Sequence, residues 1–339
     1  MSPWKDKRVL VTGGASFIGS HLVEALLAQG ADVRVIDDLS SGTRQNLEAH
    51  IRTGALEFIQ ADLRDPGAAA AAAAKREVVF HLAAIHGGRG FVDLHPADCA
   101  QNLVLDGNLF QACRQAGVRK IVYASSGCIY PNYLQANPGE ELYLQEASAG
   151  PPYDADNLYG WAKLMGEMSL RAFVKDWGIE AVSCRYFTVY GERGLENHAI
   201  MAMIARAFIR QSPFEVWGNG EQIRNWTYVG DIVSGTLLAG EKIADGSAIN
   251  LGTMERTRVR DAVRAIMEYT GFQAEVLLQP EMPTGPMNRV ADNRLARERL
   301  GWEPATPFAV GLRRTVDWYF AHKQRDQVRA TLDQLLTQR

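Results

Sequence analysis

Short apolar runs alternate with longer amphipathic stretches along the first half of the chain. The apolar run at residues 8–12 ends in two glycines, residues 18–29 follow with helical periodicity, and a second apolar run covers residues 32–38. This order predicts a strand, a tight turn, a helix and a second strand. Further strands are predicted at residues 56–60, 78–82, 120–125 and 180–185, with helices between them. Such alternation is typical of a parallel sheet that helices cover on both faces.

The alternation fades after Gly191, where proline, tryptophan and irregular loops become common. We predict an α/β fold: a Rossmann-type, doubly wound parallel sheet with a smaller, discontinuous C-terminal substrate-binding lobe. The sheet domain is expected to cover residues 1–191, with segments within 228–252 returning to it. Residues 192–227 and 253–339 would form the lobe, including helices at 291–300 and 310–325.

Composition and charge narrow the function classes. The chain has 339 residues, of which 47% are hydrophobic and 22% charged, as is ordinary for a globular protein. A formal net charge of −3 gives no reason to expect a nucleic acid or membrane partner. No apolar run has the length of a transmembrane helix and no signal peptide is recognised, so we expect a cytoplasmic location. The four cysteines form no CxxC pair, which indicates neither disulfides nor a metal site.

The turn after the first strand predicts a dinucleotide site. Gly13, Ser16, Phe17, Ile18 and Gly19 lie where a strand passes into a helix. Backbone N–H groups at a helix N-terminus favour a pyrophosphate there. Ser16 stands where the usual pattern has a glycine, and we expect its hydroxyl to donate to a phosphate.

An acid at the end of the second strand indicates which dinucleotide binds. Asp37 would accept from both ribose hydroxyls and repel a 2′-phosphate, so we predict NAD rather than NADP, tightly bound and recycled. Arg44 lies close in sequence and leaves some room for NADP. Asp62 and Leu63 are expected to contact the adenine, and Ala83 is expected to lie beside the cofactor.

Tyr159 and Lys163 are spaced i and i+4, so they share one face of a predicted helix. A nearby ammonium lowers the pKa of a tyrosine from its ordinary value of about 10. Such a tyrosine can move a hydroxyl proton while a hydride leaves the same carbon. Both residues are expected to contact the cofactor as well.

These motifs resemble the extended short-chain dehydrogenase/reductases, in the nucleotide-sugar epimerase and dehydratase branch. The resemblance covers nearly the whole chain. It rests on residues 12–19, 37–42, 81–84, 159–163, 185–191, 218–231 and 300–302.

Within that branch the chain is most similar to the GDP-mannose 3,5-epimerases, at residues 83–91, 126–131, 214–220 and 288–293. The resemblance implies that Cys128 is an acid/base group on one face of the sugar. The opposite group is a lysine in those epimerases and a histidine in GDP-fucose synthases. Here His198 holds that position, as in the synthases. The synthases use NADPH, however, which Asp37 does not favour.

The chemistry that needs these residues is epimerisation through a transient 4-keto sugar, because a ketone at C4 makes the hydrogens on C3 and C5 acidic. Tyr159 would take the C4 hydroxyl proton, Lys163 would keep the tyrosine ionised, and Ser126 would hold the C4 oxygen. Cys128 and His198 would then invert C3, C5 or both. Simple 4-epimerisation and a synthase-type epimerase and reductase remain alternatives.

The substrate is expected to be a nucleotide-diphosphate sugar similar to GDP-mannose, although the base and the sugar stay open. Arg224 and Arg289 are predicted to bind the diphosphate, because a guanidinium matches phosphate oxygens. The resemblance also implies a homodimer, built on helices at 103–115 and 158–174. The remaining predicted sugar contacts are His86, Gly87, Gly88, Arg89, Asn102 and Trp217.

Overall fold

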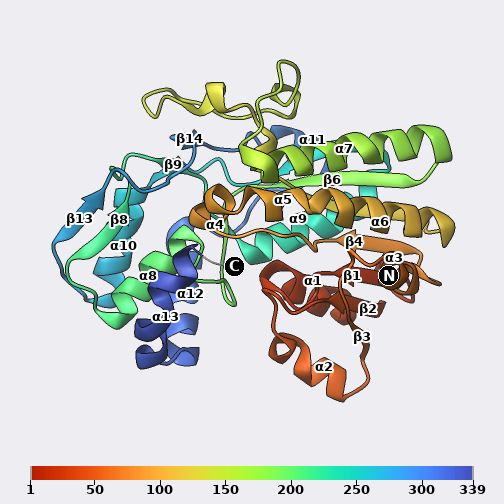
Figure 1. Cartoon of the computed structure of the whole chain (residues 1–339), viewed down its shortest axis with the longest axis horizontal. Helices are drawn as coiled ribbons and strands as arrows, with labels where there is room; N and C mark the ends of the chain where they lie inside the picture. Colours follow the sequence, from red (N-terminus) through yellow and green to blue (C-terminus); the bar gives the residue numbers. More distant parts are fainter. Residues whose placement is uncertain (1, 338–339) are drawn as a thin grey trace.

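A seven-stranded parallel sheet forms the centre of the computed structural model, which describes residues 2–337 (Figure 1). The strands lie in the order β11-β6-β5-β4-β1-β2-β3. Their bounds are β1 Arg8–Thr12, β2 Asp32–Asp37, β3 Leu56–Gln60, β4 Val78–His81, β5 Lys120–Ser126, β6 Glu180–Tyr186 and β11 Asp245–Leu251. The predicted α/β fold with a parallel central sheet is therefore confirmed.

Helices cover both faces of this sheet because side chains along each strand alternate between two cores. Val9 and Val11 of β1 pack in the core that includes helices α1, α9 and α11, whereas Leu10 packs in the core of α3, α6 and α7. These helices are α1 Phe17–Ala28, α9 Val229–Lys242, α11 Arg294–Leu300, α3 Pro66–Ala73, α6 Asn102–Gln115 and α7 Asn157–Trp177. The alternation explains why the strands are apolar at nearly every position.

A separate hydrophobic core lies at one side of the sheet, among the green and blue elements of Figure 1. It unites α8 with three helices from the last quarter of the chain and with the short strand β8. The principal elements are α8 Ala199–Ile209, β8 Phe214–Trp217, α10 Val259–Thr270, β13 Val276–Gln279, α12 Phe308–His322 and α13 Arg325–Thr337. We call this region the small lobe; the exact domain limits stay a prediction.

Shorter elements connect these two regions. The loops after β4 and β6 carry helices α4 Arg89–Leu94 and α5 Pro96–Ala100 and strand β7 Val189–Tyr190. Other short α-helices and strands are α2 Glu48–Arg52, β9 Ile223–Arg224, β10 Thr227–Tyr228, β12 Thr257–Arg258 and β14 Asn288–Arg289. Within residues 2–337, no helix combines the length and the apolar character that crossing a bilayer requires.

Two helix predictions in the last fifty residues of the chain are wrong at their ends. The helix expected from residue 291 begins only at Arg294, because Ala291 forms a bridge with Leu144 and the Asp292 carboxylate accepts from the Arg294 N–H. The terminal helix expected to run to Arg325 is two helices. They are divided at Lys323, whose backbone is extended and whose ammonium lies 2.8 Å from the carboxylate of Glu196.

Candidate active site

One cavity of about 390 Å³ lies between the small lobe and the carboxyl ends of strands in the parallel sheet. Side chains from both regions line it, as expected for a ligand site at this edge of an α/β sheet. The lining includes most predicted site residues, namely Ser16, Phe17, Ile18, His86, Gly87, Gly88, Arg89, Ser126, Cys128, Tyr159, Lys163, His198, Trp217, Arg224 and Arg289.

Ser126, Tyr159 and Lys163 meet at the end of β5 and the start of α7, and we call this part of the cavity the reaction end. Ser126 is the last residue of β5, and its Oγ accepts a hydrogen bond of 3.1 Å from the backbone N–H of Cys128. Tyr159 is also hydrogen-bonded to Ser126. The Lys163 ammonium lies 6.0 Å from the centre of the Tyr159 ring.

The expectation that Lys163 lowers the pKa of Tyr159 is wrong for this arrangement. Burial raises the pKa of the Tyr159 phenol, and the hydrogen bond with Ser126 only partly opposes the rise. Burial also lowers the pKa of Lys163 from its ordinary value. Desolvation therefore outweighs the attraction that the i, i+4 spacing suggested, because removal from water disfavours every charged form.

Close packing of α7 against the turn after β5 places Cys128 beside Tyr159. A Cβ on Gly160 would lie 2.3 Å from the carbonyl oxygen of Cys128, so only glycine permits this approach. The same carbonyl accepts a hydrogen bond of 2.8 Å from the backbone N–H of Asp156. The glycine after the tyrosine is thus needed to bring the thiol to the reaction end.

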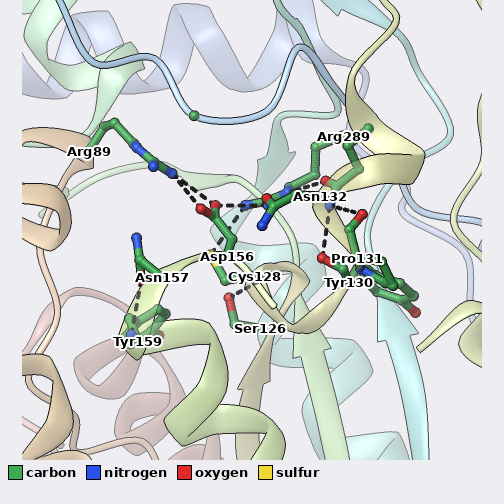
Figure 2. Close-up of polar contacts among 12 residues, drawn as sticks. Arg89, Ser126, Cys128, Tyr130, Pro131, Asn132, Asp156, Asn157, Tyr159 and Arg289 are labelled. Carbon is green, nitrogen blue, oxygen red and sulfur yellow. Dashed lines mark hydrogen bonds and ion pairs between the residues drawn. The ribbon is translucent and has the colours of Figure 1, made fainter. Parts of the chain in front are cut away.

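A carboxylate and three arginines form what we call the arginine end of the cavity, shown in part in Figure 2. The Asp156 carboxylate accepts from Arg89 Nη1 at 2.9 Å and from Arg289 Nη2 at 3.0 Å. Arg289 Nη1 also donates to the Cys128 sulfur at 3.2 Å, which links this end to the thiol. Among the described residues, Arg224 donates to backbone carbonyls only, and burial, together with the nearby Arg289, lowers its pKa.

His198 lies before α8 and faces the cavity from the small lobe. Its ring stacks on His86, with ring centres 5.9 Å apart. Burial lowers the pKa of His198 to about 4, so the ring is neutral near pH 7. The segments that carry His86 and His198 can touch because residue 88 is a glycine. A Cβ on Gly88 would lie 1.6 Å from the carbonyl oxygen of Asn197.

A second cavity of about 40 Å³ lies at the carboxyl ends of the first strands and is suited to the adenosine part of a dinucleotide. It is lined by Gly13, Ser16, Asp37, Asp62, Leu63 and Ala83, all predicted cofactor residues. Gly13 has a φ of +67°, and a Cβ there would lie 2.8 Å from the backbone nitrogen of Ala83. The buried Lys163 ammonium has no hydrogen-bond partner among the described residues, and a cofactor ribose would supply one. The two cavities therefore fit NAD.

Two details of the cofactor region differ from expectation. The Ser16 hydroxyl donates to the Gly13 carbonyl at 2.5 Å, so it stabilises the turn rather than pointing to a phosphate. Arg44 stacks over Phe58 and pairs with Glu48. It lines neither cavity, and it therefore gives no support to the binding of a 2′-phosphate.

Two predicted site residues, Asn102 and Gly19, stabilise the local fold and line neither cavity. Asn102 is fully buried, and its amide bonds to both backbone groups of Ile85 and to the Cys99 carbonyl. It therefore holds the loop after β4, and the prediction that it lines the sugar pocket is wrong. A Cβ on Gly19 would lie 2.1 Å from the Gly13 carbonyl oxygen, so this glycine permits the tight turn and lines neither cavity.

Sequence reasoning missed several residues of the cavity wall. Asp156 lies just before α7, where an aspartate usually caps the helix, but its carboxylate turns to the arginines instead. Arg206 and Glu215 line the far end, with 3.9 Å between their charged groups, and Leu336 reaches it from α13. Only the position of Asp156 before a predicted helix gave a local signal. Among the described residues, no cluster of His, Cys, Asp or Glu could hold a metal ion.

A parallel nucleotide-binding sheet with a Tyr/Lys pair on the helix beside a cavity defines the short-chain dehydrogenase/reductase class of enzymes. Comparison with known proteins narrows this class. Residues 9–252 match the NAD dependent epimerase/dehydratase family, and the chain belongs to it. The protein is an NAD-dependent enzyme of the nucleotide-sugar epimerase and dehydratase group, as the sequence motifs implied.

Relatives of two specificities are similar to the chain over most of its length. The UDP-glucose 4-epimerase of Mycolicibacterium smegmatis is 34% identical, over 92% of this chain and 98% of the relative. The GDP-mannose 3,5-epimerase 1 of Oryza sativa subsp. indica is 30% identical, over 93% of this chain and 82% of the relative. The crystal structure of Thermus thermophilus UDP-glucose 4-epimerase with NAD superposes with a TM-score of 0.81, at 30% identity, covering 93% and 100% of the chains.

Proposed function

We propose that the protein is a nucleotide-sugar epimerase that oxidises C4 of the sugar transiently and inverts that carbon. The observation that carries this proposal is the joining of the reaction end and the arginine end in one cavity. The relatives named above favour inversion at C4 over the C3 or C5 inversion that the sequence indicated first. Their substrates include UDP-glucose, so UDP-sugars enter the proposal beside GDP-sugars.

The reaction end would handle the C4 hydroxyl. When bound, NAD would supply reversible hydride transfer at C4. Ser126 would hold the C4 oxygen, and Tyr159 would take the hydroxyl proton and later give it back. Lys163 would bind the cofactor ribose and favour the ionised tyrosine. Inversion at C4 requires that the keto sugar turn before reduction, so that its other face receives the hydride.

The arginine end would bind the diphosphate. Arg89, Arg224 and Arg289 carry three positive charges, which Asp156 and the more exposed Asp93 offset only in part. The remaining positive charge favours an anionic ligand, and guanidinium forks match phosphate oxygens. Trp217 and Glu215 line the cavity beyond the arginines, where the nucleoside would lie.

A second candidate function is inversion at C3, C5 or both. It is favoured by the thiol of Cys128, which Arg289 holds at 3.2 Å in the same cavity as the neutral His198 ring. Inversion of a carbon beside a ketone needs two such groups on opposite faces of the sugar. Simple 4-epimerisation does not require either group.

Proton NMR in D₂O, with UDP-glucose and GDP-mannose as separate substrates, tests both functions. We expect isomer formation without added reductant and with no deuterium on the ring, which is the signature of 4-epimerisation. Deuterium at C3 or C5 would instead support the second candidate, and Cys128→Ala should then abolish it. Cys113→Ala is the matched control, because Cys113 is buried in the sheet core. Turnover that requires added NADH would contradict both.

A homodimer through α6 and α7 is part of the same proposal. Six large apolar side chains on these helices are 38–50% exposed, although most such side chains in the protein are buried. They are Leu103, Val104, Leu158, Trp161 and Met165, together with Trp177 at the end of α7. Exposed apolar side chains gathered on two packed helices are typical of a subunit interface. Light scattering should give twice the mass of one chain, and Trp161→Glu should give a monomer.

A further inference from the structure

A connected set of buried polar side chains lies behind Lys163, away from the cavity. Asp106, on α6, is its centre and is only 3% exposed. Its carboxylate accepts a hydrogen bond of 2.5 Å from the Tyr123 hydroxyl and one of 3.0 Å from His81 Nε2. None of these three residues lines either cavity, so none contacts a ligand there.

The hydrogen bonds fix the protonation state of His81. The Thr12 hydroxyl accepts from the backbone N–H groups of Leu82 and Ala83, so its own proton points to His81 Nδ1, at 2.7 Å. His81 Nε2 must then carry the proton that is donated to Asp106. Burial lowers the pKa of His81, which agrees with this neutral ring. His81 therefore leaves the negative charge of Asp106 uncompensated.

Lys163 carries the complementary uncompensated charge. It is 1% exposed, and its ammonium has no hydrogen-bond partner among the described residues. The ammonium lies 4.6 Å from the centre of the Tyr123 ring, the same ring whose hydroxyl donates to Asp106. Donation to a carboxylate makes the ring richer in electrons, and this strengthens its attraction for a cation.

The other charged groups around this set are paired or exposed. Glu167, one turn beyond Lys163 on α7, binds Arg185 at 2.8 Å and accepts from Ser125. On α5, Asp98 is largely exposed and Cys99 is buried, while α3 contributes only proline, glycine and alanine. A Cβ on Gly166 would lie 2.3 Å from the Tyr123 hydroxyl. The close contact between α6 and α7 therefore leaves room only for the hydrogen bond from Tyr123 to Asp106.

We propose that Asp106 is a positioning residue for the reaction, as the buried counter-charge that holds the Lys163 ammonium beneath Tyr123 and beside Tyr159. The inference rests on the proposed function only for the role of Lys163 in turnover. Asp106 opposes the desolvation that would otherwise neutralise this lysine. A charged Lys163 in turn offsets the burial that disfavours ionised Tyr159.

The direct test is the titration of Lys163 in NAD-free protein, followed by NMR after labelling lysine with ¹³C at Cε. The Lys163 signal is assigned by its loss in Lys163→Met. We expect Asp106→Asn to lower the pH midpoint of this signal by about one pH unit or more, because a nearby opposite charge is removed. The matched control, Asp98→Asn on the neighbouring α5, should leave the midpoint unchanged. An unchanged midpoint in folded Asp106→Asn would overturn the proposal.

Tyr123→Phe keeps the proposal testable if Asp106→Asn does not fold. This variant retains the ring over Lys163 and removes the hydrogen bond that orients the carboxylate. We expect a smaller downward change of the same midpoint, and no change would count against the proposal.

Kinetics supply a second measurement for the same variants. The basic limb of kcat against pH should move to lower pH in Asp106→Asn, while KM at pH 7 stays within about twofold. A loss of kcat that is uniform across pH would indicate a merely structural role and overturn the proposal. If the wild-type protein turned over no nucleotide sugar, the proposed function would fail, but the Lys163 titration would still decide the role of Asp106.

Discussion

The two ends of the cavity hold their ionisable groups in opposite ways. At the reaction end, desolvation raises the pKa of Tyr159 and lowers that of Lys163, so that each residue favours its neutral form. At the arginine end, Arg89 and Arg289 share the Asp156 carboxylate and stay charged, with hydrogen bonds of 2.9–3.0 Å. Burial therefore tunes groups that exchange protons, whereas pairing preserves groups that attract a charged ligand.

This difference separates the expected effects on kcat from those on KM and stability. Changes at the reaction end should act on kcat and on its pH dependence. Changes at the arginine end and in the lobe beyond it should act on binding and folding.

Tyr159→Phe should have the largest effect. It removes the proton-transfer group and keeps the ring, so kcat should fall by about 10²–10⁴ while KM changes little. Steady-state kinetics on UDP-glucose or GDP-mannose measure this, with bound NAD confirming the fold. Tyr153→Phe, at an exposed tyrosine of the same segment, is the control and should keep full activity. A Tyr159→Phe variant with more than half of the wild-type kcat would contradict the role of Tyr159 in proton transfer at the reaction end.

Asp156→Asn should have the next largest effect, and chiefly on stability. It leaves two guanidinium groups without their shared buried carboxylate, which costs about 3–5 kcal/mol when such a pair is broken. Urea unfolding measures the free energy. Asp93→Asn is the matched control, because it removes the other carboxylate of Arg89 at a more exposed position and should cost about 0–1 kcal/mol. Equal losses for the two variants would mean that the arginine end is not a buried network.

Leu336→Ala should have a moderate effect on substrate binding. Leu336 lines the lobe end of the cavity from α13, and a buried leucine side chain contributes about 1.5–3 kcal/mol. We expect KM to rise by about tenfold with kcat nearly constant, because the contact is remote from C4. Leu335→Ala, next to it on the same helix, is the control. An unchanged KM for Leu336→Ala would exclude α13 from the nucleoside site.

The smallest predicted effect concerns acid stability. Burial lowers the pKa of His198 from 6.5 to about 4, so the unfolded chain binds a proton more readily than the folded one in this range. The stability that neutral His198 allows is therefore complete above pH 6.5 and falls as the pH decreases towards 4. Urea unfolding of wild type and His198→Gln at pH 7 and pH 5 should show a smaller loss in the variant. Equal losses of unfolding free energy in the two proteins would mean that burial does not lower the pKa of His198.

The sheet could be predicted from the sequence because its signals are local. Apolar runs, the glycine turn at Gly13 and the acid at Asp37 each follow from one segment, and each of the six predicted strands is present in the observed sheet. The Tyr159 and Lys163 pair was found in the same way, since an i, i+4 spacing fixes a shared helix face.

The short strands between the sheet and the small lobe, and the charge networks, could not be predicted because their partners are distant in sequence. Strands β9, β12 and β14 are two residues long and exist through pairing with one another, which no local pattern encodes. Asp156 binds Arg289 across 133 positions, and Asn102 was misplaced because its amide satisfies the loop at Ile85. The pKa of Tyr159 was misjudged because burial is a property of the whole fold.

The central claim is a C4 ketone that forms and disappears within one protein molecule, and a label at C4 tests it most directly. Nucleotide sugar with deuterium at C4 is incubated with the NAD-loaded protein in ordinary water, for both UDP-glucose and GDP-mannose. The account predicts an epimerised product that keeps the deuterium on C4, because the same hydride returns to the carbon it left. A product whose C4 carries solvent hydrogen would contradict it.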